Sequence, residues 1–166
     1  MALIIEDGTN VVGAQAWADA ATCITFAATY FGSNLTGSEA DKEATILRTV
    51  NFMNNLNWKG APTNGRLQEL AWPRSGIDDV TDSEIPREII KAQHILARAE
   101  HAAAGTLAPS GKVADQRKKV KVDVIEVEYV DTDAGIDAQR VVVTDAMDLL
   151  APFLRGVTPA LGSGWY

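Results

Sequence analysis

The chain has 166 residues and a mass of 17.8 kDa, which suits one domain with one hydrophobic core. Hydrophobic residues make up 46% and charged residues 22% of it, so the composition excludes a disordered, collagen-like or disulfide-stapled class. Cys23 is the only cysteine, which excludes an intrachain disulfide and fits a reducing compartment. No apolar stretch reaches the roughly 20 residues of a membrane span, and the first residues lack an export signal.

Charge is distributed unevenly along the chain. The net charge is −7, from 15 Lys and Arg against 22 Asp and Glu. Residues 112–121 carry +4, so the rest of the chain carries −11. A basic island on an acidic body indicates either a partner site or a solvated loop.

The N-terminal half predicts an extended arm followed by two helices. Asp19 is typical of an N-cap, and the helix that it opens should end at Phe31, because Gly32 follows. This helix carries no charge, so we expect it to be buried on more than one side, by the core of the chain itself or by another subunit, with Cys23 as a small core residue. Ser38, with Asp41 three residues later, predicts a second helix that runs to about residue 57.

The middle of the chain combines a long irregular connection with the clearest helix. Residues 58–83 lack helical periodicity, and Trp72 is expected to anchor them. Pro86 opens a third helix that ends before Gly105. Its predicted core stripe is Ile85, Ile89, Ala92, Leu96, Ala99 and Ala103. Its opposite face carries a partly basic ridge of Arg87, Lys91, His94, Arg98 and His101.

The last third predicts strands and a final helix. Alternating apolar residues from Val120 to Tyr129 change phase by one residue, which indicates a strand with a bulge or bend near residues 123–125. Residues 131–135 have turn chemistry, and residues 140–143 can return as a second strand. Thr144 can cap a last helix that bends or ends near Pro152. The predicted fold class is mainly α with a β-hairpin (α+β): one domain over residues 1–155 and a flexible tail over 156–166.

The sequence shows no assembled reaction centre. His94 and His101 lie seven residues apart, roughly 10 Å along a helix, and are expected to be solvated and not metal ligands. The acidic residues at 78–84 and 131–137 lack the order of a calcium loop. Phosphate-cradling glycine loops and nucleophile elbows are also missing. We therefore expect no catalytic residue, no metal site, no cofactor and no enzymatic activity.

Five segments of the chain carry a family resemblance. They are residues 3–8, 67–74, 85–86, 125–129 and 145–154, and the most specific piece is Leu-Ala-Trp-Pro-Arg at 70–74. This pattern, over residues 1–155, resembles the head-tail connector proteins of tailed bacteriophages, the adaptors beneath the portal. Part of this sequence family is also labelled as DnaT-like single-stranded-DNA-binding proteins. The alternative is therefore a primosomal replication protein that binds single-stranded DNA.

The connector resemblance implies a four-helix, adaptor-like protomer with a long hairpin and extended termini. Copies would form a homo-oligomeric ring, commonly of twelve, between the portal and the stopper or tail-completion protein. Such a ring assembles in the bacterial host cytoplasm and resides in the virion neck. Duplex DNA would pass through it without specific binding, which the acidic balance suits.

Three groups of residues are the expected interfaces under these two hypotheses. For portal and tail binding they are Pro159, Leu161, Trp165 and Tyr166. For loop anchoring and subunit contacts they are Trp58, Trp72, Pro73 and Arg74. For contacts with DNA or an acidic partner they are Arg87, Lys91, Arg98, Arg117, Lys118, Lys119 and Lys121.

Overall fold

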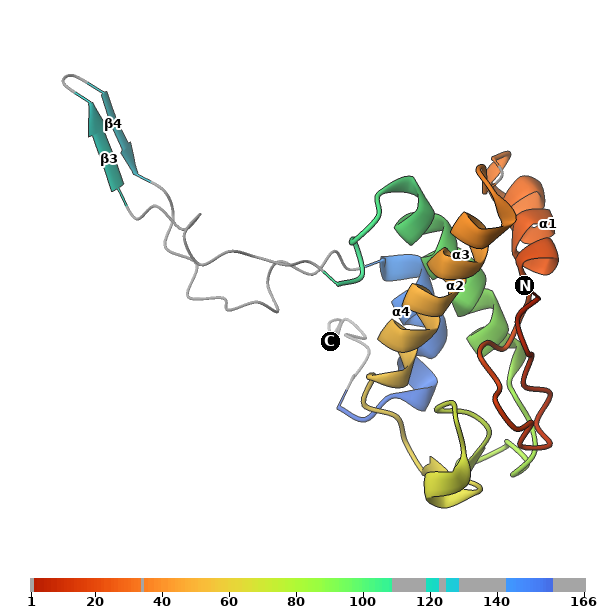
Figure 1. Cartoon of the computed structure of the whole chain (residues 1–166). Helices are drawn as coiled ribbons and strands as arrows, with labels where there is room; N and C mark the ends of the chain where they lie inside the picture. Colours follow the sequence, from red (N-terminus) through yellow and green to blue (C-terminus); the bar gives the residue numbers. More distant parts are fainter. Residues whose placement is uncertain (1, 34, 109–118, 123–124, 129–142, 157–166) are drawn as a thin grey trace, which may run out of the picture.

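The computed structural model describes residues 2–33, 35–108, 119–122, 125–128 and 143–156. Four helices and two small antiparallel sheets confirm the α+β class (Figure 1). No helix in these ranges is both long and apolar enough to cross a membrane. The elements in chain order are α1 (Ala20–Phe31), α2 (Glu39–Asn54), β1 (Ala61–Pro62), the 3-10 turn η1 (Gly65–Leu67), β2 (Arg74–Ser75), α3 (Arg87–Ala102), β3 (Lys119–Val122), β4 (Ile125–Glu128), α4 (Thr144–Leu150) and the 3-10 turn η4 (Ala151–Phe153).

Helix α3 is the centre of the helical body, since it contacts α1, α2 and α4. Its buried residues Ile89, Ala92 and Leu96 confirm the centre of the predicted stripe. Ile85 and Ala99 are half-buried, Ala103 is exposed, and Ala97 is buried in addition. Gln93, also buried, accepts a hydrogen bond from the Trp17 backbone and donates to the Ala18 carbonyl. This amide fixes the start of α1 against α3. The resulting core runs through all four helices and the connecting loop.

The predicted caps of the first two helices are confirmed. The Asp19 carboxylate accepts from the Thr22 backbone N–H at 2.8 Å, and Gly32 ends α1 with a left-handed φ of 63°. Ser38 and Asp41 form a reciprocal capping box at the start of α2. This helix ends at Asn54, three residues earlier than expected.

Within the single chain, α1 is covered on one side. Within this chain only Ala20, Cys23 and Ala27 of α1 are fully buried, while most other positions are exposed. One side of the helix packs on α3 and α2. Nothing else among the described residues covers its other side. The core of the chain itself therefore does not bury α1 on several sides, burial by another subunit stays a prediction, and Cys23 is a core residue as expected.

The long connection after α2 is ordered by two Trp residues and one Arg. Trp72 is fully buried and meets Trp58 and Phe153 edge-on, with ring centroids 5.7 and 5.4 Å away. The buried Arg74 donates to the carbonyls of Lys59, Gly60 and Ala71 at 2.6 to 3.1 Å. Trp72 therefore anchors this loop, as predicted. Strands β1 and β2 pair with each other within the loop.

The structure has two short strands, β3 and β4, where the sequence predicted one long strand from Val120 to Tyr129. Strands β3 and β4 pair antiparallel, Val120 opposite Val127 and Val122 opposite Ile125, so the chain reverses between Val122 and Ile125. A two-residue connection shifts the alternation by one residue, which is the phase change that we interpreted as a bulge or bend. The second strand was expected at residues 140–143; residues 140–142 lie outside the described residues, and Val143 precedes α4 and is not in a strand.

The last helix also differs in detail from its prediction. Val143 precedes α4 and Thr144 is its first helical residue, so Thr144 does not cap it. The expected end near Pro152 is confirmed, because the chain passes into η4 there. Helix α4 packs on α3 through Ala146 and Leu150, which closes the helical body.

Candidate nucleic-acid interface

Three aromatic rings gather at the end of α1, and we name Phe26, Tyr30 and Phe31 the aromatic cluster. Residues 26 and 30 are one helical turn apart, and their rings stack with centroids 4.4 Å apart and an interplanar angle of 14°. Phe31 lies 6.2 Å from both other rings. Tyr30 is 64% exposed, so the outer ring of the stack faces solvent.

Arg98 of α3 brings a positive charge to this cluster. Its guanidinium carbon lies 4.2 Å from the centroid of the Phe31 ring, a cation–π contact, and its Nε donates to Ser33 Oγ at 3.2 Å. The guanidinium is thereby held at the edge of an exposed aromatic surface. A stacked ring beside a fixed cation can hold a flat base and its phosphate.

The middle of the predicted basic ridge is covered by α1. His94 is buried, 5.0 Å from the Phe26 ring, and its Nδ1 lies 3.0 Å from Cys23 Sγ. The expectation that His94 is solvated is wrong, because the small residues Cys23 and Ala27 let α1 lie close over α3. His101 is half-buried, and its Nε2 accepts from the Thr36 backbone N–H at 2.9 Å.

The Cys23–His94 pair is not a nucleophilic site. Burial, and secondarily the charge of Asp19, raises the pKa of the Cys23 thiol to about 12. Burial also lowers the pKa of His94, although Asp19 acts in the opposite direction. Both groups are therefore neutral at neutral pH, and the thiol is fully buried.

The structure brings only one of the predicted cationic residues to the aromatic cluster. Arg87 is the first residue of α3, roughly 16 Å along the helix from Arg98, and forms a 3.0 Å ion pair with Glu88. Lys91 lies between them and is half-buried. Lys119 and Lys121 belong to β3. Arg117 and Lys118 lie outside the described residues.

The other predicted interface residues fall into two groups. Trp58, Trp72, Pro73 and Arg74 are buried inside the chain, where they anchor the loop, and their contacts with neighbouring subunits stay a prediction. Pro159, Leu161, Trp165 and Tyr166 lie outside the described residues, as do residues 131–137. In the ranges that the structure describes, no group of three or more His, Cys, Asp or Glu is placed to hold a metal ion.

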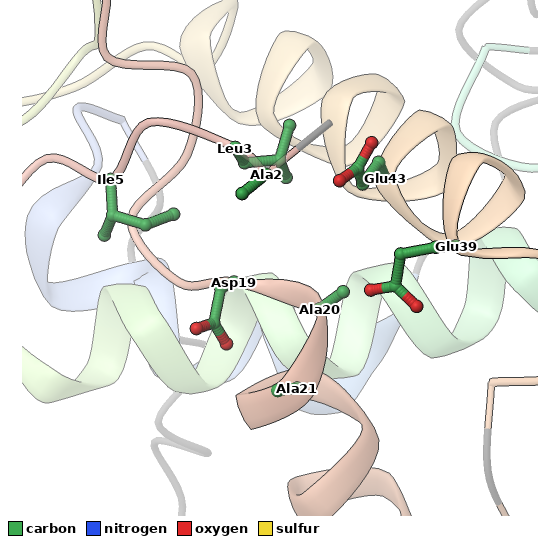
Figure 2. Close-up of a pocket in the computed structure, with 8 residues that line it drawn as sticks. All are labelled: Ala2, Leu3, Ile5, Asp19, Ala20, Ala21, Glu39 and Glu43. Carbon is green, nitrogen blue, oxygen red and sulfur yellow. The ribbon is translucent and has the colours of Figure 1, made fainter.

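A pocket on the N-terminal side of the body was missed by sequence reasoning. It has a volume of about 200 Å³, and it is lined by the N-terminal arm, the start of α1 and the first turns of α2 (Figure 2). Asp19, Glu39 and Glu43 are among the residues that line it, and the Asp19 carboxylate caps α1 through Thr22. Acidic residues at helix starts were a visible signal, but they also stabilise the helix dipole, so their convergence needed the fold.

These features place the chain among mainly helical α+β proteins that have a hairpin. Its distinguishing surface feature is the exposed aromatic cluster beside a cation. A family model described as "Putative DnaT-like ssDNA binding protein" matches residues 1–163, and the chain belongs to this family. No curated protein and no solved structure matches the chain.

Proposed function

We propose that this protein binds single-stranded DNA, without catalysis, through the aromatic cluster and Arg98. The observation that carries the proposal is the exposed Tyr30 ring, which is stacked on Phe26 beside a cation held on Phe31. Membership of the DnaT-like family supports the same function. This was the alternative hypothesis from the sequence, and it now has a surface that can be tested.

Base stacking supplies the larger share of the binding free energy in this proposal. An unstacked base lies on the outer face of Tyr30, which Phe26 supports from behind, and Arg98 meets the neighbouring phosphate. Lys91 and Arg87 extend the positive charge along α3. Because the chain carries a net charge of −7, it neutralises few phosphates of the DNA. Its affinity for single-stranded DNA should therefore fall only moderately with added salt.

Replacing Tyr30 with alanine should weaken binding of single-stranded DNA by about tenfold, because it removes one stacking platform. The measurement is fluorescence anisotropy of a labelled oligothymidylate titrated with the full chain. Tyr30 is on the surface, so the substitution leaves the core intact.

Two variants serve as matched controls for Tyr30→Ala. Tyr30→Phe keeps the ring and should bind as wild type. Leu67→Ala removes an exposed apolar side chain, 84% accessible, far along the chain from the cluster, and should change nothing. Equal binding by wild type and Tyr30→Ala would exclude the cluster as the DNA site.

A second candidate function is the head-tail connector of a tailed bacteriophage. The observation that favours it is the outward side of α1, where Ala21, Thr25, Ala28 and Thr29 are exposed and no charged residue occurs in the helix. An uncharged helix surface suits a permanent contact with a second copy, as a ring requires.

In the connector proposal, the chain forms a ring, with twelve copies as the expected number, between the portal and the stopper or tail-completion protein in the virion neck. The segment 156–166, with Trp165 and Tyr166, binds the portal. Removal of this segment should abolish assembly with portal, as imaged by negative-stain microscopy, and leave the circular dichroism spectrum unchanged. Undiminished assembly would contradict the role of the segment.

A further inference from the structure

Two segments far apart in the sequence pair beside the end of α2 and bring two exposed cations together. Residues 57–59 and 153–155 form a short antiparallel pairing around a bridge at its centre. The Lys59 backbone N–H donates to the Phe153 carbonyl, and the Arg155 backbone N–H donates to the Asn57 carbonyl, both at 2.8 Å. Lys59 and Arg155 are both exposed, and the alternation of an extended pairing puts them on the same face of it.

Arg74 of β2 brings a third positive charge to the same place. The Nη2 atoms of Arg74 and Arg155 both donate to the Gly60 carbonyl, at 3.1 and 3.0 Å. Arg74 Nε also donates to the Lys59 carbonyl at 2.6 Å, and Lys59 Nζ donates to the Pro152 carbonyl at 2.7 Å. We name Lys59, Arg74 and Arg155 the cation triad.

The cation triad has no negative partner in the part of the chain that the structure describes. None of its three side chains forms an ion pair with a carboxylate there, and the carbonyl groups that they contact carry no full charge. Arg74 is 7% exposed, and burial, followed by the positive charge of Arg155, lowers its pKa. Because a buried charge without a counter-ion is costly, an anion beside Arg74 would stabilise this arrangement.

The chemistry of the triad favours a phosphate group over a carboxylate. Beyond their carbonyl contacts, Arg155 and Lys59 have further N–H donors that face solvent. A guanidinium matches two oxygens of a phosphate at once, and an ammonium group adds a compact charge. A phosphate also carries more negative charge than a carboxylate, which suits three adjacent cations.

We propose that the cation triad binds a phosphate group, which Arg155 and Lys59 contact directly while Arg74 supplies a fixed positive charge behind them. The phosphate belongs either to the backbone of single-stranded DNA or to a phosphate ion in solution. Only the first source rests on the proposed function. In that case the triad is a second contact, separate from the aromatic cluster.

NMR of the full, ¹⁵N-labelled chain, titrated with sodium phosphate at constant ionic strength, tests the site. At about pH 7.5, where phosphate is mainly a dianion, the backbone signal of Gly60 and the Nε–H signal of Arg155 should shift until they saturate. Arg155→Gln should weaken phosphate binding by about tenfold or more, because it removes charge-assisted hydrogen bonds, and Lys59→Gln by about fivefold. Sodium acetate should bind clearly more weakly than phosphate.

Arg66→Gln is the matched control for the two variants. Arg66 is exposed in the same long connection, so this substitution removes an equal charge outside the triad and should leave phosphate binding as in wild type. Amide signals that stay unchanged away from residues 57–60 and 153–155 show that a variant is folded.

Titration of a labelled oligothymidylate distinguishes the two sources of the phosphate. If the phosphate is part of DNA, Arg155→Gln lowers the affinity for the oligothymidylate and reduces the slope of its logarithm against log salt by about 0.7. If the triad takes only the phosphate ion, Arg155→Gln binds the oligothymidylate as wild type does but has lost phosphate binding. Both outcomes support the phosphate site.

Three results would overturn the proposal. They are the absence of saturating shifts at the triad with phosphate, undiminished phosphate binding by Arg155→Gln, and acetate binding as tight as that of phosphate. Each can occur whether or not Tyr30→Ala weakens DNA binding, so failure of the phosphate site and failure of the proposed function are distinguishable.

Discussion

Replacing Trp72 with alanine should lower the free energy of unfolding by about 4 kcal/mol. Trp72 is fully buried and forms edge-to-face contacts with Trp58 at 88° and with Phe153 at 89°. Truncation removes both aromatic contacts and leaves a cavity between the long connection and η4. The Trp17 indole donates to the backbone carbonyl of Trp72 at 3.3 Å, and the substitution keeps this carbonyl.

Urea unfolding followed by circular dichroism measures this effect. Leu67→Ala, in the same connection but 84% exposed, is the control and should change the free energy of unfolding by less than about 0.5 kcal/mol. Trp72→Phe should cost clearly less than alanine. It keeps an aromatic ring, and the indole N–H that it removes has no hydrogen-bond partner in the described structure. A loss below about 1 kcal/mol for Trp72→Ala would show that other contacts anchor the loop.

Local signals in the sequence were sufficient for the starts of α1 and α2 and for the end of α1. Asp19, Ser38 and Asp41 act through hydrogen bonds within three residues, so a pattern of side chains next to each other in the sequence determines them. Gly32 acts through its own φ. The same reasoning identified Trp72 as an anchor, because burial in the core stabilises a large aromatic side chain in an otherwise polar connection.

Interactions between distant segments could not be predicted in this way. His94 is buried because Cys23, 71 residues earlier, leaves room for it. Gln93 is buried because its side-chain amide pairs with the backbone of Trp17 and Ala18, which are 76 and 75 residues earlier. The sequence shows charge and spacing, but the partner of a buried polar group depends on which helices pack together.

The exposed side of α1 illustrates the same limit for function. A run of twelve uncharged residues predicts removal from water, and the single chain does not provide it. Whether DNA or another copy meets Tyr30 is decided by surfaces outside this chain. The sequence therefore predicts an interface on this helix, and the occupant of that interface is the subject of the two proposed functions.

Glu100 of α3 links α2 with the segment that follows α3. It is 1% exposed and accepts from the backbone N–H groups of Gly105 and Leu107 at 2.8 and 3.0 Å, which orders the chain leaving α3. It also accepts from Arg48 Nε of α2 at 2.8 Å. Burial alone would raise the pKa of Glu100, but these hydrogen bonds and the Arg48 charge outweigh it and hold the pKa below its ordinary value.

Replacing Glu100 with glutamine should lower the free energy of unfolding at about pH 7 by about 2 kcal/mol, since a charged acceptor of three hydrogen bonds becomes neutral. A carboxyl group whose pKa is lower in the folded state stabilises the fold above its unfolded pKa, and this contribution disappears as the pH falls through the folded pKa. The difference between wild type and Glu100→Gln should therefore shrink from about pH 5 downwards, as urea unfolding across that range would show. Glu69→Gln, at an exposed position, should cost little at any pH. A difference that stays constant with pH would assign the loss to packing instead of charge.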